Sequence, residues 1–300
     1  MEWGTSMNYE YYKIFFAVGK YKNITRAAQE LFSSQPAVTR VIHNMEAELG
    51  CQLFIRSKAG VEFTREGKEL YDLIETPCNL LLRADQELYQ SVGWQEGTIH
   101  IGTTDTALQC FLFDFLEVFR QEHPGVHFKI YTGSSSRMIS RLENGEVDLV
   151  FNTTPFPNSR SLSVTSVEKF NDILVGGNQY RSLSEKPVSL KDIQNYPFIL
   201  LSRGMQYRQF CDEFFRKHSV HIEPALEADS SGLIVPMVIH NWGLAFVPEA
   251  MAREALTNGS IVKITLTEPI PCRYVTLVTD PQKPLSKTVR LMREMIIVAK

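Results

Sequence analysis

The sequence predicts an α/β protein with an N-terminal helical module, a long connecting helix and a C-terminal body of two lobes. Its 300 residues exceed the usual size of one domain, which indicates two or three packed units. Apolar residues recur at helical spacing in the N-terminal part, and from residue 98 onward strand-like and helix-like segments alternate. This alternation predicts parallel strands with helices on the faces of the sheet. Hydrophobic residues at 44% and charged residues at 22% are typical of a folded globular chain.

Several protein classes are disfavoured by what the chain lacks. It has no run of eighteen apolar residues and no cationic N-terminal segment followed by an apolar one. The sequence therefore predicts neither a membrane span nor a secretory signal, and a cytoplasmic location. Its cysteines are odd in number and form no C-x-x-C pair, which favours reduced thiols over a disulfide framework or a zinc site. They are Cys51, Cys78, Cys110, Cys211 and Cys272.

The charge is distributed unevenly along the chain. The whole sequence has a net charge of -3, yet residues 7–66 carry eight basic and six acidic side chains. The N-terminal segment is thus mildly basic on an acidic body. This is a weak electrostatic indication of nucleic-acid binding and does not suffice alone.

Two short helices are predicted first, on either side of a break between Gly19 and Asn23. Asn23 is a suitable N-cap for the second helix, and Ser33-Ser34 separates it from a third helix that begins at Gln35-Pro36. The apolar positions of the first two helices are Tyr12, Phe15, Phe16, Val18, Ile24, Ala27, Ala28, Leu31 and Phe32.

The third helix is predicted over 36–49 and ends at Gly50. Its inward stripe consists of Val38, Met45 and Leu49, with either Val41 or Ile42. Helix, short turn and helix is the arrangement that places its second member in a DNA major groove. Next come two predicted strands, 53–56 and 61–64, around a polar turn, which is typical of a wing. By periodicity alone, a small helical bundle with a hairpin fits equally well.

The side chains near the start of the third helix suit DNA. Glutamine, threonine and arginine can contact base edges, whereas serine hydroxyls and helix N-terminal amides suit phosphates. Basic residues on the wing suit phosphate or the minor groove. The expected DNA-binding residues are Ser33, Ser34, Gln35, Pro36, Thr39, Arg40, Arg56 and Lys58.

Five short segments follow one another in this module: Ala27-Ala28-x-x-Leu31, Ser34-Gln35-Pro36-Ala37-Val38-Thr39-Arg40, Met45-Glu46-x-x-Leu49-Gly50, Leu53-Phe54-x-Arg56 and Phe63-Thr64-x-x-Gly67. Together they resemble the winged helix-turn-helix of LysR-type transcriptional regulators. Thr39, Met45 and Phe63 depart conservatively from the family's usual Ser, Leu and Leu. The resemblance implies a regulator that binds double-stranded operator DNA and whose binding is modulated by a small-molecule effector.

A long amphipathic helix is predicted to follow Thr64 and to reach about Ser91. The resemblance makes it a linker helix that forms a homodimer, with further contacts that give a homotetramer; the alternative is a helix folded back on its own body. Pro77 lies inside the pattern, so we expect a kink or break there. Its apolar stripe is Leu70, Leu73, Ile74, Leu80, Leu81, Ala84 and Leu88.

The remainder of the chain reads as two α/β lobes joined by two crossing strands, near 168–172 and 266–273. Strands are predicted at 98–102, 126–131, 147–151, 172–175, 198–201, 221–225, 244–247 and 274–278. Helices are predicted at 106–121, 136–144, 206–218, 232–240, 248–257 and 286–298. The resemblance extends over this part, which is similar to periplasmic binding proteins.

The predicted domains follow from these segments. Residues 1–65 form the winged helix-turn-helix, 66–92 the linker helix and 93–300 the effector-binding domain. In the last, lobe I takes about 97–168 and 272–300, and lobe II takes about 169–271.

Polar residues concentrate where the predicted strands end, which is where ligands sit in open α/β sheets. They suit a small polar or anionic effector, with Arg203 or Arg137 as counter-ion. Asp105 complicates the case for an anion, because a carboxylate at a helix start already occupies the favourable potential, so an uncharged or cationic effector stays open as an alternative. Alternatively, the hydroxyls cap the following helices and bind nothing. The expected effector-binding residues are Thr103, Thr104, Ser134, Asn152, Thr153, Ser202 and Arg203.

Motifs of catalysis are missing from the sequence. It contains no Gly-rich phosphate loop, no G-x-S-x-G and no H-E-x-x-H, so we expect no enzyme, no cofactor and no metal. Three alternatives stay open: a solute-binding protein, an enzyme that uses the cleft between the lobes, and a regulator that senses oxidants through Cys211. The last would need a low thiol pKa and a resolving cysteine, and none is close in sequence.

Overall fold

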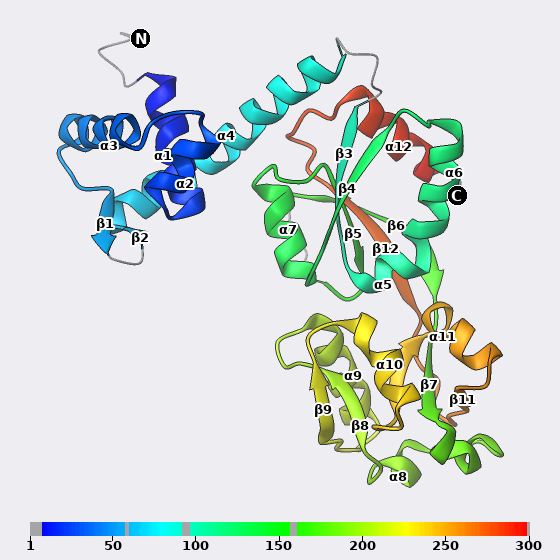
Figure 1. Ribbon diagram of the computed structural model, residues 1–300. Helices are drawn as coiled ribbons and strands as arrows, with labels where there is room; N and C mark the ends of the chain where they lie inside the picture. The colour runs from blue at the N-terminus through cyan, green and yellow to red at the C-terminus, as the bar shows by residue number, and fades with distance from the viewer. Residues whose placement is uncertain (1–7, 58–59, 92–96, 157–160, 299–300) are drawn as a thin grey trace. The chain divides into compact units, whose positions relative to one another are not determined.

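The computed structural model describes residues 8–57, 60–91, 97–156 and 161–298, with the backbone alone at 56–57 and 83–91. The chain forms two compact units that divide between Tyr89 and Gln90, and each is described by itself (Figure 1).

The first unit contains α1 (Tyr9–Tyr21), α2 (Ile24–Glu30), α3 (Gln35–Leu49), β1 (Phe54–Ser57), β2 (Gly60–Phe63) and α4 (Arg65–Ser91). The predicted caps are confirmed: Asn23 Oδ1 accepts from Arg26 N at 2.9 Å, and Gly50 ends α3 with φ 69°. Strands β1 and β2 pair antiparallel with Phe54 opposite Phe63, which confirms the predicted hairpin.

Packing decides which predicted apolar positions are inside. Val38, Ile42 and Met45 of α3 are buried, so Ile42 rather than Val41 completes the inward stripe. The prediction for Leu49 is wrong: it is 41% exposed, because the last turn of α3 extends beyond the core. Phe32 is also not inside. It follows the end of α2 with φ 50°, which turns its side chain off the helical face and leaves it fully exposed.

Of the kink or break predicted at Pro77, the break is absent, because helix α4 continues past this residue. Its first half packs on the N-terminal core through Tyr71 and Cys78, which are buried, and Leu70 and Ile74, which are half-buried. This packing offsets the backbone hydrogen bond that a proline removes. The first half of α4 is thus part of the N-terminal unit.

Lobe I of the second unit is built on a five-stranded sheet in the order β4-β3-β5-β12-β6. Strands β3, β4 and β5 are parallel, as predicted, while β12 is antiparallel to β5 and β6. Helices α6 and α12 cover one face of the sheet and α7 covers the other (Figure 1). A π-helix, Leu108–Leu112, joins α5 to α6. The elements are β3 (Thr98–Thr103), α5 (Asp105–Ala107), α6 (Phe113–Glu122), β4 (His127–Thr132), α7 (Ser135–Glu143), β5 (Leu149–Thr153), β6 (Ser163–Phe170), β12 (Arg273–Thr279) and α12 (Lys287–Val298).

Lobe II has an antiparallel sheet in the order β10-β7-β11 and a parallel pair, β8-β9. The strand predicted at 221–225 lies instead at Pro224–Ala228, and β11 has no counterpart in the prediction. The elements are β7 (Asp172–Gly177), α8 (Leu190–Ile193), β8 (Phe198–Leu201), α9 (Gln206–Lys217), β9 (Pro224–Ala228), α10 (Ile234–Ile239), β10 (Ala245–Pro248), α11 (Glu249–Thr257) and β11 (Ile261–Ile264), with 3-10 turns at Asn178–Ser184 and Ser231–Leu233.

A buried ion pair lies where the two lobes join. Arg273, the first residue of β12, is 3% exposed, and its Nη1 donates to both carboxylate oxygens of Asp172 at 3.3 and 3.1 Å. The same guanidinium donates through Nε to the Thr154 carbonyl at 2.7 Å and through Nη2 to Thr153 Oγ1 at 3.0 Å. It also stacks over the Tyr207 ring at 4.1 Å. The guanidinium thus connects β5 of lobe I, the start of β7 and α9 of lobe II.

Removing the charge of Asp172 is expected to destabilise the second unit. Asp172→Asn leaves the buried Arg273 charge uncompensated, which costs about 3 kcal/mol of unfolding free energy. Urea denaturation of the full chain, followed by circular dichroism, measures this loss. As a control, Glu249→Gln breaks the exposed Glu249–Lys263 pair of 2.7 Å and is expected to cost less than about 1 kcal/mol. Equal losses in the two variants would contradict the assignment.

Candidate functional site

The N-terminal half of α3 presents polar side chains outward. Ser34 is the N-cap: its Oγ accepts from Ala37 N at 3.3 Å, and Pro36 follows in the first turn, where a missing amide hydrogen is tolerated. Thr39 is half-buried and Arg40 is exposed. Within the part of the chain that the structure describes, Arg40 makes no ion pair and no hydrogen bond through its side chain. The structure therefore places six of the predicted DNA-binding residues together: Ser33, Ser34, Gln35, Pro36, Thr39 and Arg40.

Two features of this surface escaped the sequence analysis. The fully exposed Phe32 lies in the turn before α3, where the sequence pattern had placed an inward apolar residue. Glu46, on the far turn of α3, accepts at Oε1 from Leu53 N at 2.8 Å and Phe54 N at 3.3 Å. This contact fixes the start of the hairpin against α3, so the wing and the helix are held as one body.

The wing residues are only partly described. For Arg56 the structure gives the backbone, within β1, and Lys58 lies outside the described residues.

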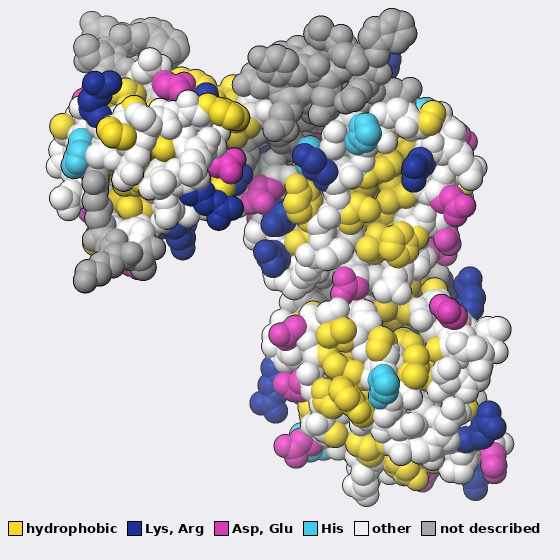
Figure 2. All heavy atoms as spheres, viewed as in Figure 1, with side chains coloured by type: hydrophobic (Ala, Val, Ile, Leu, Met, Phe, Trp, Pro, Cys, Tyr) yellow, Lys and Arg dark blue, Asp and Glu magenta, His cyan; other side chains and the backbone are white. Residues whose placement is uncertain are grey.

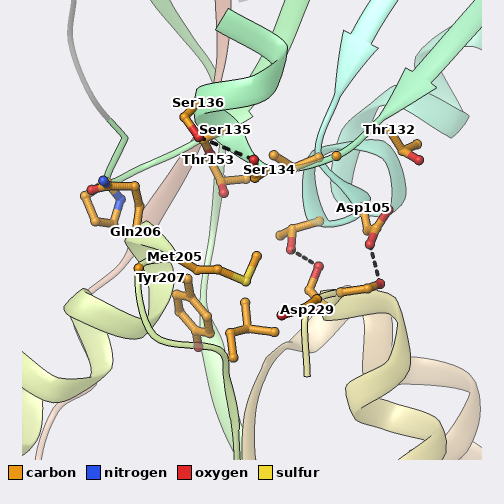
Figure 3. A pocket seen from close by; sticks show the side chains of 18 of the residues that line it. Asp105, Thr132, Ser134, Ser135, Ser136, Thr153, Met205, Gln206, Tyr207 and Asp229 are labelled. Atoms are coloured by element: carbon orange, nitrogen blue, oxygen red, sulfur yellow. Dashed lines mark hydrogen bonds between the residues drawn. The ribbon is translucent and has the colours of Figure 1, made fainter. Parts of the chain in front are cut away.

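A cavity of about 260 Å³ lies between the lobes of the second unit. Figure 3 shows it from close by. Lobe I contributes the start of α5, the start of α7 and the end of β5, and lobe II contributes the start of α9 and the segment after β9. The lining residues are Thr104, Asp105, Thr106, Thr132, Gly133, Ser134, Ser135, Ser136, Thr153, Pro155, Leu201, Gly204, Met205, Gln206, Tyr207, Asp229, Ser230, Ser231 and Arg273.

Of the predicted effector-binding residues, Thr104, Ser134 and Thr153 line this cavity. The others lie elsewhere for identifiable reasons. Thr103 is buried and donates to the Thr104 carbonyl at 3.1 Å, and Asn152 lies within the protein next to Ser135. Arg203 lines a separate hollow on lobe II, and it is the following Gly204 and Met205 that reach the cavity. Neither Ser202 nor Arg137, the other counter-ion considered, is among the lining residues.

The capping interpretation of the hydroxyls holds in part. Thr104 Oγ1 accepts from Ala107 N at 3.2 Å and Ser134 Oγ accepts from Arg137 N at 3.4 Å, so both residues cap helices and line the cavity. The Thr104 hydroxyl oxygen is used as an acceptor, which leaves its hydrogen available to a ligand, whereas Ser134 Oγ also lies 3.3 Å from Ser136 Oγ and shares a hydrogen bond with it.

Two hydrogen bonds connect the lobes at the rim of the cavity. Ser230 Oγ donates to Asp105 Oδ2 at 2.6 Å, and Thr106 Oγ1 donates to Ser231 Oγ at 3.0 Å (Figure 3). The floor is Arg273 with the Tyr207 ring beneath its guanidinium. These interlobe contacts were not found from the sequence, because Asp105 and Ser230 are far apart along the chain.

The buried Cys211 and the half-buried Cys110 do not have the properties of redox sensors. Burial raises the pKa of the Cys211 thiol to about 12, and burial together with the Asp172 carboxylate raises that of the Cys110 thiol to about 12. Both therefore stay protonated near neutral pH, whereas the thiolate is the reactive form. Within the described ranges, no group of three His, Cys, Asp or Glu residues is placed to hold a metal ion.

Thiol labelling is expected to distinguish the cysteines. In the native protein, Ellman's reagent should modify the exposed Cys272 fastest, should modify Cys110 slowly because its thiol stays protonated, and should reach the buried Cys211 only on unfolding. Stopped-flow absorbance gives the rates, and Cys272→Ser should abolish the fast phase. A fast phase that survives in Cys272→Ser and disappears in Cys211→Ser would show an activated thiol at position 211.

No helix in the described residues is long and apolar enough to cross a membrane.

Comparisons with known proteins cover both units. Residues 10–68 match the family model of the bacterial regulatory helix-turn-helix protein, lysR family, and residues 93–298 match that of the LysR substrate binding domain. The HTH-type transcriptional regulator BbuR of Bordetella bronchiseptica is 25% identical over 287 residues, covering 94% of this chain and 87% of that protein. The HTH-type transcriptional activator IlvY of Haemophilus influenzae is 28% identical over 264 residues, covering 86% and 89%.

The crystal structure of full-length CbnR complexed with its target DNA has the same fold. It superposes with a TM-score of 0.74 at 18% sequence identity and covers 98% of this chain and 100% of that chain. The architecture expected from the sequence, a winged helix-turn-helix followed by a two-lobed α/β domain like that of periplasmic binding proteins, is therefore confirmed.

Proposed function

The chain belongs to the LysR family of bacterial transcriptional regulators, and we propose that it binds a specific operator as a homo-oligomer under the control of a small molecule held between its lobes. The family supplies the DNA-binding helix-turn-helix and the substrate-binding domain. The operator contacts, the oligomer and the control by a ligand are our proposals for this chain. It acts in the cytoplasm, where the operator lies.

One observation carries the DNA-binding proposal: the exposed N-terminal half of α3 bears an unpaired arginine beside polar side chains and a capped helix start. Placed in a major groove, Arg40 donates to a guanine, while Gln35 and Thr39 approach neighbouring base edges. Ser33, Ser34 and the amides of the first turn of α3 contact phosphates. Arg56 and Lys58, on the wing, add phosphate or minor-groove contacts.

Losing Arg40 is expected to weaken specific binding. Arg40→Ala should cost about 1 to 3 kcal/mol of operator affinity, because a bidentate arginine–guanine contact disappears. Fluorescence anisotropy with DNA from beside the protein's own gene measures this loss, with an unrelated duplex as the reference for nonspecific binding.

The matched control is Arg65→Ala, which removes another exposed arginine, one that pairs with Glu69 at 3.1 Å on α4. Arg65→Ala should leave the operator affinity nearly unchanged. If Arg40→Ala binds the operator as tightly as the unmodified protein, α3 does not contact bases through this residue. Lys58→Ala should instead lower the affinity for both duplexes and make binding less dependent on salt concentration.

Exposed apolar residues on α4 support a dimer. Leu73 is 75% exposed and Leu81 is 45% exposed, while the opposite side of the helix packs on the first unit. Two copies that bury these residues would form a symmetric pair with two α3 helices for the two halves of a palindromic operator.

A second apolar area supports further association into a tetramer. On lobe II, Leu233, Ile239 and Trp242 are exposed around α10, where Figure 2 shows hydrophobic side chains gathered.

Charges on the α4 stripe are expected to break the dimer. Leu73→Glu with Leu81→Glu places four like charges in the two-fold contact, so the species measured by sedimentation velocity should shift toward the monomer. Ile55→Glu, at a residue 55% exposed on β1, is the control and should leave the oligomer intact. An unchanged oligomer in the double variant would exclude this face of α4 from the interface.

Control by a ligand follows from the position of the cavity. Because both lobes line it, a bound molecule stabilises one relative orientation of the lobes over others. A ligand shifts such an equilibrium only by its difference in affinity for the two arrangements, typically about 1 to 3 kcal/mol. The coupling is reciprocal, so operator DNA changes the affinity for the ligand by the same factor.

A further inference from the structure

We propose that the small molecule in the cavity is a zwitterion, with an ammonium group held at Asp105 and Asp229 and a carboxylate held at the start of α7 next to Ser135. The inference rests on the proposed function, since it assumes that this cavity is the effector site.

One side of the cavity is acidic. Asp105 uses Oδ2 to accept from Ser230, and within the described residues its Oδ1 has no protein partner. Asp229 is exposed and forms no ion pair with the described residues. Among the lining residues that the structure describes, the one cationic side chain is Arg273, which Asp172 already neutralises. This side therefore carries uncompensated negative charge and favours a cationic group of the ligand.

The other side consists of hydrogen-bond donors. Ser134, Ser135 and Ser136 lie at the N-terminus of α7, and Thr153 lies beside them, across the cavity from Asp105 (Figure 3). Ser134 caps the Arg137 amide, whereas the Ser135 and Ser136 amides have no partner within the helix and form its positive end. Arg273 Nη2, bound to Thr153 Oγ1, retains a second hydrogen near this side.

A buried amide lies under α7, directly behind one of the cavity-lining serines. Asn152 is fully buried, and its Nδ2 has no hydrogen-bond partner, although buried polar groups nearly always have one. Its Oδ1 instead accepts from Ser135 Oγ at 2.6 Å, and Ser135 lines the cavity.

A carboxylate at Ser135 fits the other orientation of this amide, in which Nδ2 has a partner and Oδ1 has none. If the ligand accepts the Ser135 hydroxyl hydrogen, rotation of the Asn152 carboxamide by half a turn places Nδ2 against Ser135 Oγ as a donor. The serine oxygen then accepts from Asn152 while its hydrogen binds the ligand. Asn152 is thus a positioning residue for an anionic group, which is consistent with its place in the sequence-based prediction although it does not line the cavity.

The two sides together specify both charges. A carboxylate alone would leave Asp105 and Asp229 unpaired against a second negative charge, and an amine alone would leave the donors at the start of α7 without an acceptor. Since one cavity of about 260 Å³ borders both sides, a single small molecule fills it and meets both. A small amino acid or a similar amino carboxylate has this size and charge pattern.

The test is isothermal titration of the full-length protein with matched probes. The proteinogenic amino acids are screened first by thermal shift, and for each binder the deaminated carboxylic acid and the decarboxylated amine are titrated beside it. At least one amino acid should bind, and each one-ended analogue should bind about tenfold or more weakly, which corresponds to about 1.4 kcal/mol.

Two variants should separate the two ends. Asp105→Asn should weaken binding of the amino acid and of the amine at least about tenfold. Its affinity for the carboxylic acid should be unchanged or higher. Ser135→Ala should weaken binding of the amino acid and of the carboxylic acid and leave the affinity for the amine unchanged. Asp114→Asn, on the exposed side of α6, and Ser140→Ala, on the exposed side of α7, are the matched controls and should change none of these affinities.

The outcomes distinguish the inference from the function on which it rests. If no amino acid binds, or if a carboxylic acid binds as tightly as its amino acid, the zwitterion is excluded. In the latter case, loss of binding in Ser135→Ala would still support the cavity as the ligand site. Binding that neither Asp105→Asn nor Ser135→Ala changes would exclude the cavity itself. Operator binding by the ligand-free protein is measured separately, and its absence would overturn the DNA-binding function alone.

Discussion

The buried pair of Arg273 and Asp172 is the contact on which the second unit depends. It joins the first residue of β12 to the first residue of β7, and the same guanidinium is held by Thr153 and the Thr154 carbonyl at the end of β5. Three segments far apart in sequence are thereby fixed at the junction of the lobes. The same side chains form the floor of the cavity. A buried charge needs this full set of partners, so the junction tolerates few alternative arrangements.

In the first unit, the close contact between α4 and the strand β1 segment has the same importance. Gly67, in the first turns of α4, lies so near the backbone of Leu53 that a Cβ there would overlap the Leu53 carbonyl oxygen. Glu46 holds the amide of the same residue, Leu53, from α3. The wing strand is thus clamped between α3 and α4 around a cluster of aromatic rings that includes Phe15, Phe54, Phe63 and Tyr71. This makes the polar start of α3 and the wing parts of one rigid surface.

Hydroxyl groups serve two purposes around the cavity. Thr104 and Ser134 end on the cavity because they cap helices that start at the carboxyl ends of strands, and that edge is also where an α/β fold opens toward ligands. The same hydroxyl-bearing residues can therefore cap a helix and also contact a ligand. The carboxylates beside them, Asp105 and Asp229, give the cavity a charge pattern that the hydroxyls alone would not specify.

Local pattern in the sequence determined the helices and their caps, the hairpin, the alternation of strands and helices, and the group of polar residues on α3, because these depend on neighbours within a few positions. Tertiary structure alone decided which residues meet across long separations. Arg273 with Asp172, Ser230 with Asp105 and Asn152 with Ser135 are pairs whose members carry no mutual signal in one sequence. It also decided that Phe32 and Leu49 face outward and that Gly204 and Met205 reach the cavity in place of Ser202 and Arg203. A side chain at the end of an element is directed by the exit of the backbone and by packing, and periodicity ends there.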